Sequence, residues 1–146
     1  MSAARPRVKH RGELMHINWF AVVAAALASF VVGGVWYSPL LFVKAWKAEI
    51  GVSPDAKASM ASMGPQFGGT LVLSVVQAGM FALFLGNSQT PATGAAYGCA
   101  AGLCWVATAL GINYLYEGKS LRLWLINGGY NVVTFTLYGL ILSAWK

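Results

Sequence analysis

The residues of this chain that could do chemistry are neutral hydrogen-bonding side chains, set at helical spacing inside stretches without charge. They are Thr70, Ser74, Gln77, Asn113, Asn127, Tyr130, Asn131, Thr134 and Tyr138. Within each charge-free stretch, intervals of three and four residues place most of these side chains on one helix face. Such side chains can form hydrogen bonds between helices, or they can line a path for water or a small solute. Hydrogen bonding between helices is the favoured interpretation, and the polar path is the alternative.

Acid–base, redox and metal chemistry have few candidate residues. Only four of the 146 residues are acidic, which argues against paired-carboxylate catalysis. No Gly-rich phosphate loop, zinc-ligand spacing or nucleophile elbow is present. Cys99 and Cys104 diverge by roughly 140° on a helix, so they cannot form a disulfide and are expected to be small packing residues. We expect no catalytic residue, no metal and no cofactor, and therefore no enzyme.

The elements that must position the polar side chains are membrane-spanning helices. Positions 14–43, 58–116 and 123–145 contain no Asp, Glu, Lys or Arg. Hydrophobic residues make up 58% of the chain and charged residues 10%, whereas an ordinary soluble domain is about 25% charged. One span takes about 20 apolar residues. The first and third stretches therefore hold one span each, and the middle stretch holds two.

The sequence predicts an all-α membrane protein with four transmembrane helices. The expected spans are 17–38, 66–85, 93–116 and 121–145. Ser120 is expected to cap the last span, and short connections should make the last three spans consecutive antiparallel neighbours. Residues 1–16 are expected to form a basic N-terminal tail, and residues 17–146 a single transmembrane domain.

A short amphipathic helix at the membrane surface is expected between the first and second spans. Ser38-Pro39 is a typical helix start, and residues 40–50 place apolar side chains on one face and two lysines on the other. This segment is too short to span and should lie in the interface. Two tryptophans of the first span, 17 residues apart, fit the two membrane surfaces. The expected interfacial residues are Trp19, Trp36, Tyr37, Lys44, Trp46 and Lys47.

Two rows of small residues predict close contact between helices. They are Ala25, Ser29 and Gly33 in the first span, and Gly94, Gly98 and Gly102 in the third. At four-residue spacing, small side chains let two helix backbones approach each other in a membrane. Packing within the chain is the default expectation for the glycine row, and self-association through it is the alternative.

The positive charge of the chain does not decide its orientation. The formal net charge of +6 suggests basic residues near anionic lipid and not nucleic-acid binding. The side that holds both termini carries Arg5, Arg7, Lys9, Arg11 and Lys146. The other side carries Lys44, Lys47, Lys57, Lys119 and Arg122. These counts are equal, so the positive-inside rule favours neither orientation.

Three stretches carry a resemblance to a known family. They are Asn18-Trp19 with residues 34–42 and 44–46, residues 107–109 with 113–117, and residues 121–131 with 139–142. These stretches resemble the family of small bacterial membrane proteins known as domain of unknown function 1761. The resemblance implies a four-span bundle in the bacterial inner membrane, with no assigned reaction and no catalytic residues. It favours the orientation in which residues 39–65 lie in the cytoplasm.

We therefore expect a non-catalytic integral membrane protein, an accessory or packing subunit. Its expected partners are membrane lipid and either a membrane protein complex or further copies of itself. The alternative function is a small-solute carrier or pore, formed by an oligomer and lined by polar residues of the second, third and fourth spans. An enzyme that acts on lipid is the third possibility, with only Glu49, Asp55 and Glu117 as acidic groups at the membrane surface.

Overall fold

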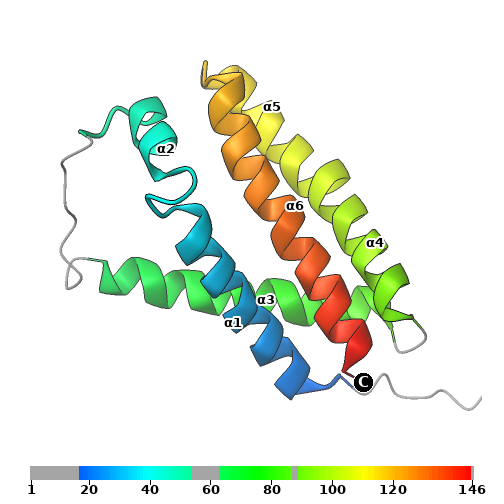
Figure 1. The fold of residues 1–146 in the computed structure, drawn as a ribbon. Helices are drawn as coiled ribbons and strands as arrows, with labels where there is room; N and C mark the ends of the chain where they lie inside the picture. The colour runs from blue at the N-terminus through cyan, green and yellow to red at the C-terminus, as the bar shows by residue number, and fades with distance from the viewer. Residues whose placement is uncertain (1–16, 54–62, 87–88, 146) are drawn as a thin grey trace, which may run out of the picture.

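The computed structural model describes residues 17–53, 63–86 and 89–145, and these are mainly helical (Figure 1). The elements are α1 (Trp19–Trp36), α2 (Val43–Glu49), α3 (Gly64–Leu85), α4 (Pro91–Ala101), the π-helix η1 (Gly102–Ala107), α5 (Thr108–Tyr116) and α6 (Leu121–Ala144). Since α4, η1 and α5 are continuous, four helices are long and apolar enough to cross a membrane. The all-α fold, with four candidate spans and a short helix between the first two, is confirmed. The expected tail at 1–16 lies outside the described residues.

Polar side chains cap three of the long helices at their N-termini. The Asn18 side chain accepts a hydrogen bond from the backbone N–H of Ala21 at 3.1 Å. Thr90 does the same for Thr93, and Ser120 for Leu123 at 3.0 Å. Each cap satisfies one backbone donor that the first helical turn leaves without a partner. The predicted role of Ser120 is confirmed.

The chain between α1 and α2 differs from the prediction. The Ser38 hydroxyl donates to the carbonyl oxygen of Val35 at 2.7 Å, so it closes the end of α1 and does not cap α2. Turns through Phe42, closed by backbone hydrogen bonds, then lead into α2. As a result α2 has only seven residues, and it packs on α6.

Helix α6 is the centre of the arrangement. The α4–α5 helix packs along one side of α6, and α1 packs on another side, with both neighbours antiparallel to α6 (Figure 1). The start of α1 meets the end of α6, where the Asn18 side-chain amide donates to the carbonyl oxygen of Trp145 at 3.4 Å. The three helices α1, α4–α5 and α6 therefore form one layer, in which α6 has a neighbour on each side.

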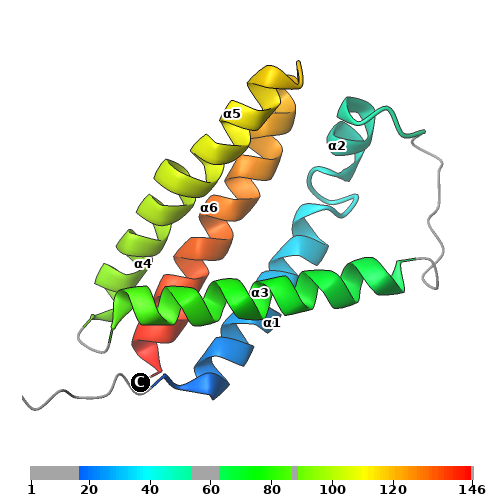
Figure 2. The same ribbon diagram turned by 180° about the vertical axis from the view of Figure 1, so that it is seen from behind.

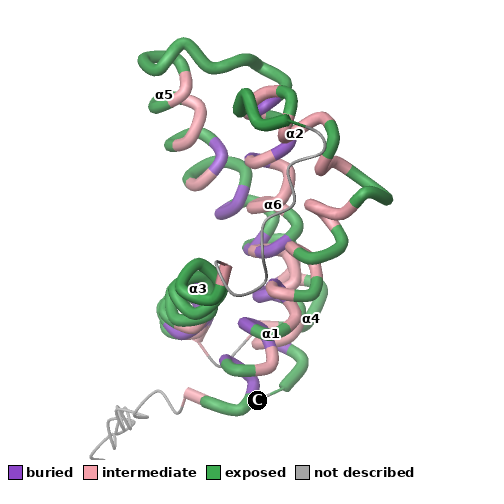
Figure 3. The backbone as a smooth tube through the Cα atoms, turned by 90° about the vertical axis from the view of Figure 1, so that its left-hand side faces the viewer, coloured by how far each residue is buried: buried purple, intermediate pink, exposed green. Residues whose placement is uncertain are grey.

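Helix α3 does not take the place predicted for it. It crosses α1 and the C-terminal half of α6 on the back of the layer (Figure 2). The expectation that the second and third spans are antiparallel neighbours is wrong, because the small-residue face of α4 is already packed on α6. Residues 64–73 of α3 are exposed (Figure 3). A membrane must cover this apolar surface.

The core is small and lies where α1, α3, α4 and α6 meet. Its buried members are Val22, Ala25, Ala78, Phe81, Leu85, Ala101 and Tyr138. Phe81 of α3 packs edge-on against Phe135 of α6, with ring centroids 5.4 Å apart. Only this half of α3 is anchored by buried side chains, since the buried residues of α3 begin at Ser74.

We predict that a side chain at Gly98 destabilises the fold. A Cβ atom there would lie 2.7 Å from the carbonyl carbon of Phe135 and 2.9 Å from the Cα of Thr136, both backbone atoms of α6. Gly98→Ala should therefore lower the free energy of unfolding by about 1–3 kcal/mol, measured by thermal or denaturant unfolding in detergent. Gly68→Ala is the matched control, because nothing lies within 4 Å of a Cβ at that position. Equal stability of the two variants would contradict the close contact between α4 and α6.

Candidate functional site

The amide of Asn127 joins three parts of the chain at one end of the layer. Its Oδ1 accepts a hydrogen bond from the Tyr37 hydroxyl at 2.8 Å. Its Nδ2 donates to the Tyr114 hydroxyl oxygen, also at 2.8 Å. Tyr37 follows α1, Tyr114 belongs to α5 and Asn127 to α6, so one side chain links α6 to both of its neighbours.

Aromatic rings surround this amide on the α1 side. We call Trp36, Tyr37, Phe42, Trp46 and Tyr130 the aromatic cluster. The centroid of the Tyr37 ring lies 5.5 Å from that of Tyr130 and 5.6 Å from that of Trp46. The Trp36 indole N–H donates to the carbonyl oxygen of Ile126 at 3.0 Å, and it can reach α6 because Gly129 has no side chain. These contacts hold the indoles of Trp36 and Trp46 close to the end of α1, and they fix α2 beside α6.

Burial raises the pKa of Tyr37, and the neighbouring Tyr130 and Tyr114 raise it further. The raised pKa keeps the hydroxyl protonated, as its role of donor to Asn127 requires.

Nearer the other end of α6, the predicted polar stripe faces α1. The buried Tyr138 hydroxyl donates to the Ser29 Oγ at 3.1 Å, and the Tyr130 hydroxyl lies 3.5 Å from the Ser29 carbonyl oxygen. Ser74 of α3 is buried within reach of Tyr138. Thr134 is buried too, and its Oγ1 has no hydrogen-bond partner among the described residues.

Besides Thr134, four of the candidate polar residues form no hydrogen bond to another helix of the described chain. The Asn131 amide donates to the carbonyl oxygen of Asn127 at 2.8 Å, which lies in the same helix. Thr70, Gln77 and Asn113 are exposed. These three side chains therefore meet no other helix of the described chain, because α3 lies across the layer and Asn113 is on the exposed side of α5. The expectation that they face other helices stays a prediction.

The glycine row of α4 and η1 meets α6 along its length. A side chain at Gly94 would collide with Ser143 and Gly139, and one at Gly102 would lie 2.7 Å from the Cα of Val132. The glycine row therefore packs on α6 of the same chain, as the default expectation of packing within the chain predicts. In α1, Ala25 and Ser29 are buried, and Gly33 lies against the Tyr130 ring.

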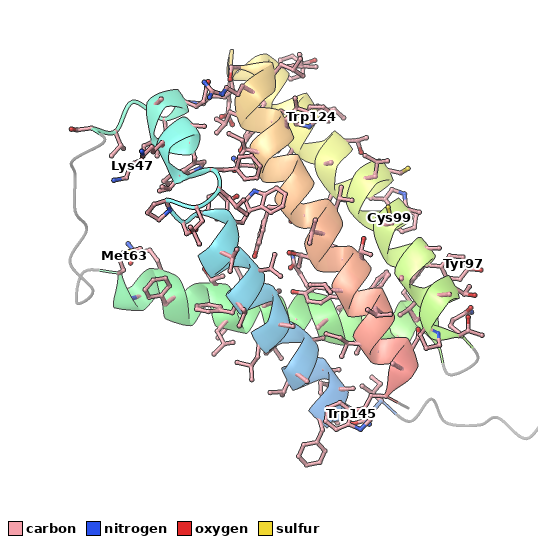
Figure 4. All side chains as sticks on the ribbon, in the orientation of Figure 1. Lys47, Met63, Tyr97, Cys99, Trp124 and Trp145 are labelled. Carbon is pink, nitrogen blue, oxygen red and sulfur yellow. The ribbon has the colours of Figure 1, made fainter. Side chains whose placement is uncertain are left out.

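The remaining predicted residues lie near the ends of the helices. Trp19 and Lys44 are exposed, whereas Trp46 and Lys47 of α2 are half-buried. The two cysteines are free, as expected, and they are exposed, so they do not pack against other parts of the described chain. Cys99 and Tyr97 point away from α6 (Figure 4). The described residues contain no group of three or more His, Cys, Asp or Glu that could hold a metal ion.

The π-helix η1 was not predicted from the sequence, and it shapes the end of the layer that Trp124 occupies. The wider turn changes which carbonyl oxygens find backbone partners. The Thr108 hydroxyl donates to the carbonyl oxygen of Cys104 at 2.6 Å, and the Trp124 indole N–H donates to that of Ala107 at 2.6 Å. Gly111 makes room for this indole, since a Cβ there would lie 2.8 Å from its Nε1.

An apolar groove lies between α5 and α6, beside Trp124. Its volume is about 420 Å³. Lys119 and Ser120, in the turn between the two helices, form its charged and polar end. The Ser120 hydroxyl also donates to the Glu49 carboxylate of α2, and the guanidinium of Arg122 lies 3.9 Å from the same carboxylate. This end of the protein combines an apolar groove with cations.

We predict that the Asn127 amide stabilises the fold. Asn127→Ala would leave the hydroxyls of Tyr37 and Tyr114 without these partners, and it should lower the free energy of unfolding by about 1–3 kcal/mol. Asn113→Ala is the control, because Asn113 is exposed and should change the stability little. Thermal unfolding of both variants in the same detergent measures the difference. No loss of stability in Asn127→Ala would show that the amide does not hold the helices together.

Comparison with known proteins identifies a family but no activity. No curated protein and no solved structure gives a significant match to the chain. The family model described as "Protein of unknown function (DUF1761)" matches residues 20–143. This range covers the four candidate spans almost completely, and it confirms the resemblance seen in the sequence. The chain therefore belongs to the DUF1761 family of unknown function, and its four candidate spans indicate a multi-pass membrane protein.

Proposed function

We propose that this protein is a non-catalytic packing subunit that associates with another transmembrane helix through α3. The partner we propose is a second copy of the same chain. The proposal is supported by the exposed position of α3 and by one residue in particular, Gln77.

Gln77 lies near the middle of α3, in a span that contains no charged residue. Its side chain is exposed, and it forms no hydrogen bond with any residue in the described part of the chain. An amide that faces hydrocarbon without a partner is costly. A partner within the membrane would remove this cost.

A second copy of the chain offers the complementary groups. An amide carries both a donor and an acceptor, so two Gln77 side chains related by a two-fold axis can pair reciprocally. Interhelical hydrogen bonds of this kind drive association in membranes. The same face of α3 contributes apolar surface around the amide. Its exposed members are Leu73, Met80 and Phe84, at four, three and seven residues from Gln77.

The alternative function, an oligomeric carrier or pore, has less support. Asn127 and Tyr138 form hydrogen bonds with neighbouring side chains. The Asn131 side chain donates a hydrogen bond to a backbone carbonyl oxygen of its own helix. These residues therefore do not offer a polar lining to a solute. The groove of the described residues is apolar and lies at the surface.

The proposed location is the bacterial inner membrane, with residues 39–65 in the cytoplasm. The described cations gather at the end of the layer formed by α2 and the α5–α6 turn, where Lys44, Lys47, Lys119 and Arg122 lie. Over the full sequence the two sides carry equal numbers of Lys and Arg, so charge does not decide the orientation. The proposed cytoplasmic position of this end rests on the family resemblance.

The proposal predicts that Gln77→Leu weakens dimerisation in lipid bilayers. Förster transfer between labelled copies, measured over a range of protein-to-lipid ratios, gives the dissociation constant of the dimer. Loss of the paired amides should raise this constant by roughly 3- to 20-fold. Val72→Leu is the control, because Val72 is exposed on a different face of α3. Monomeric wild-type protein at all ratios, or an unchanged constant in Gln77→Leu, would contradict the proposal.

A further inference from the structure

The groove between α5 and α6 has walls that fit a lipid acyl chain. Its lining consists of Thr108, Gly111, Ile112, Tyr114, Leu115, Lys119, Ser120, Leu121 and Trp124. Three aliphatic members, Ile112, Leu115 and Leu121, are exposed on the protein surface. The groove lies beside Trp124, which Figure 4 labels near the α5–α6 turn. Hydrocarbon is therefore the natural neighbour of these side chains.

The groove is held open by contacts that do not involve a ligand. The Trp124 indole is fixed by its hydrogen bond to the carbonyl oxygen of Ala107, and it lies on the bare backbone of Gly111. Because the indole cannot move across the groove without losing this bond, the site is preformed. Preformed apolar pockets with a few polar groups are typical of ligand sites.

The charge at the end of the groove belongs to Lys119. This lysine is exposed and makes no ion pair with a residue that the structure describes. Arg122, by contrast, has the Glu49 carboxylate at 3.9 Å. Glu117 occupies the same turn but does not line the groove. The positive charge at the groove is thus available to an anion from outside the protein.

Tyr114 also lines the groove. Its hydroxyl oxygen accepts the hydrogen bond from Asn127, whose amide also bonds Tyr37, so this hydroxyl belongs to the network between the helices. Lys119 is therefore the group that would recognise an anionic headgroup at the groove.

We propose that this groove binds one anionic phospholipid. The phosphate pairs with the ammonium group of Lys119, and one acyl chain lies along Ile112, Leu115 and Leu121. Basic pockets between transmembrane helices bind acidic headgroups in this way. The site does not rest on the proposed dimer. The groove is formed by α5, the following turn and the start of α6, whereas the proposed dimer contact lies on α3.

Native mass spectrometry of the detergent-purified full chain tests the site. The protein is titrated with phosphatidylglycerol and, separately, with phosphatidylcholine, and each bound lipid is counted. Lys119→Gln should weaken the first phosphatidylglycerol by roughly fivefold and change phosphatidylcholine little. Lys44→Gln is the matched control, because Lys44 is an exposed lysine at the same end but outside the groove.

A second pair of variants tests the acyl chain. Ile112→Trp should fill the groove and weaken both lipids, whereas Leu125→Trp, at an exposed position outside the groove, should not. Circular dichroism of each variant establishes that it is folded. Equal effects of Lys119→Gln and Lys44→Gln would overturn the site in favour of diffuse charge attraction. Displacement of the lipid by inorganic phosphate at equal concentration would overturn it in favour of a simple anion site.

The proposals of a dimer and of a lipid site can be contradicted independently of each other. In Gln77→Leu the first phosphatidylglycerol should bind as it does in the wild type, whatever the oligomeric state. Loss of that lipid in Gln77→Leu would overturn the assignment to the α5–α6 groove, because it would place the lipid at the dimer interface.

Discussion

The contact between α4 and α6 is the interaction on which the rest of the structure depends. In lipid, helices gain little from the hydrophobic effect when they meet, so close packing and a few hydrogen bonds must hold them together. Gly94, Gly98 and Gly102 provide the close packing, because their missing side chains allow backbone contact with α6. With α6 fixed in this way, its opposite face is presented to α1.

The hydrogen bonds follow the same logic on the α1 side. The amide of Asn127 and the hydroxyl of Tyr138 find partners on neighbouring elements, as polar groups within a bilayer must. Gln77 is different, since it points outward from α3 near mid-span. A single principle, that hydrocarbon cannot satisfy a polar group, therefore explains both the internal network and the surface that we assign to a partner.

The sequence was sufficient for the spans, the Ser120 cap and the glycine row, because charge-free length and small-residue spacing are local properties. It was not sufficient for the position of α3. Periodicity shows which residues share a face, as Thr70 and Gln77 do, but not which helix that face meets. In a membrane even hydrophobicity does not separate the core from the surface, because lipid is as apolar as the interior. The π-helix and the groove beside Trp124 depend on tertiary contacts, and no residue pattern marked them.

The central claim is that this DUF1761 protein acts by association and that α3 carries the contact. The most direct test is the mass of the intact assembly extracted from its native membrane in mild detergent, at native stoichiometry. The account predicts a mass of two copies of the chain, with or without bound lipid. A single copy alone, or one copy at fixed ratio with a different protein, would contradict it.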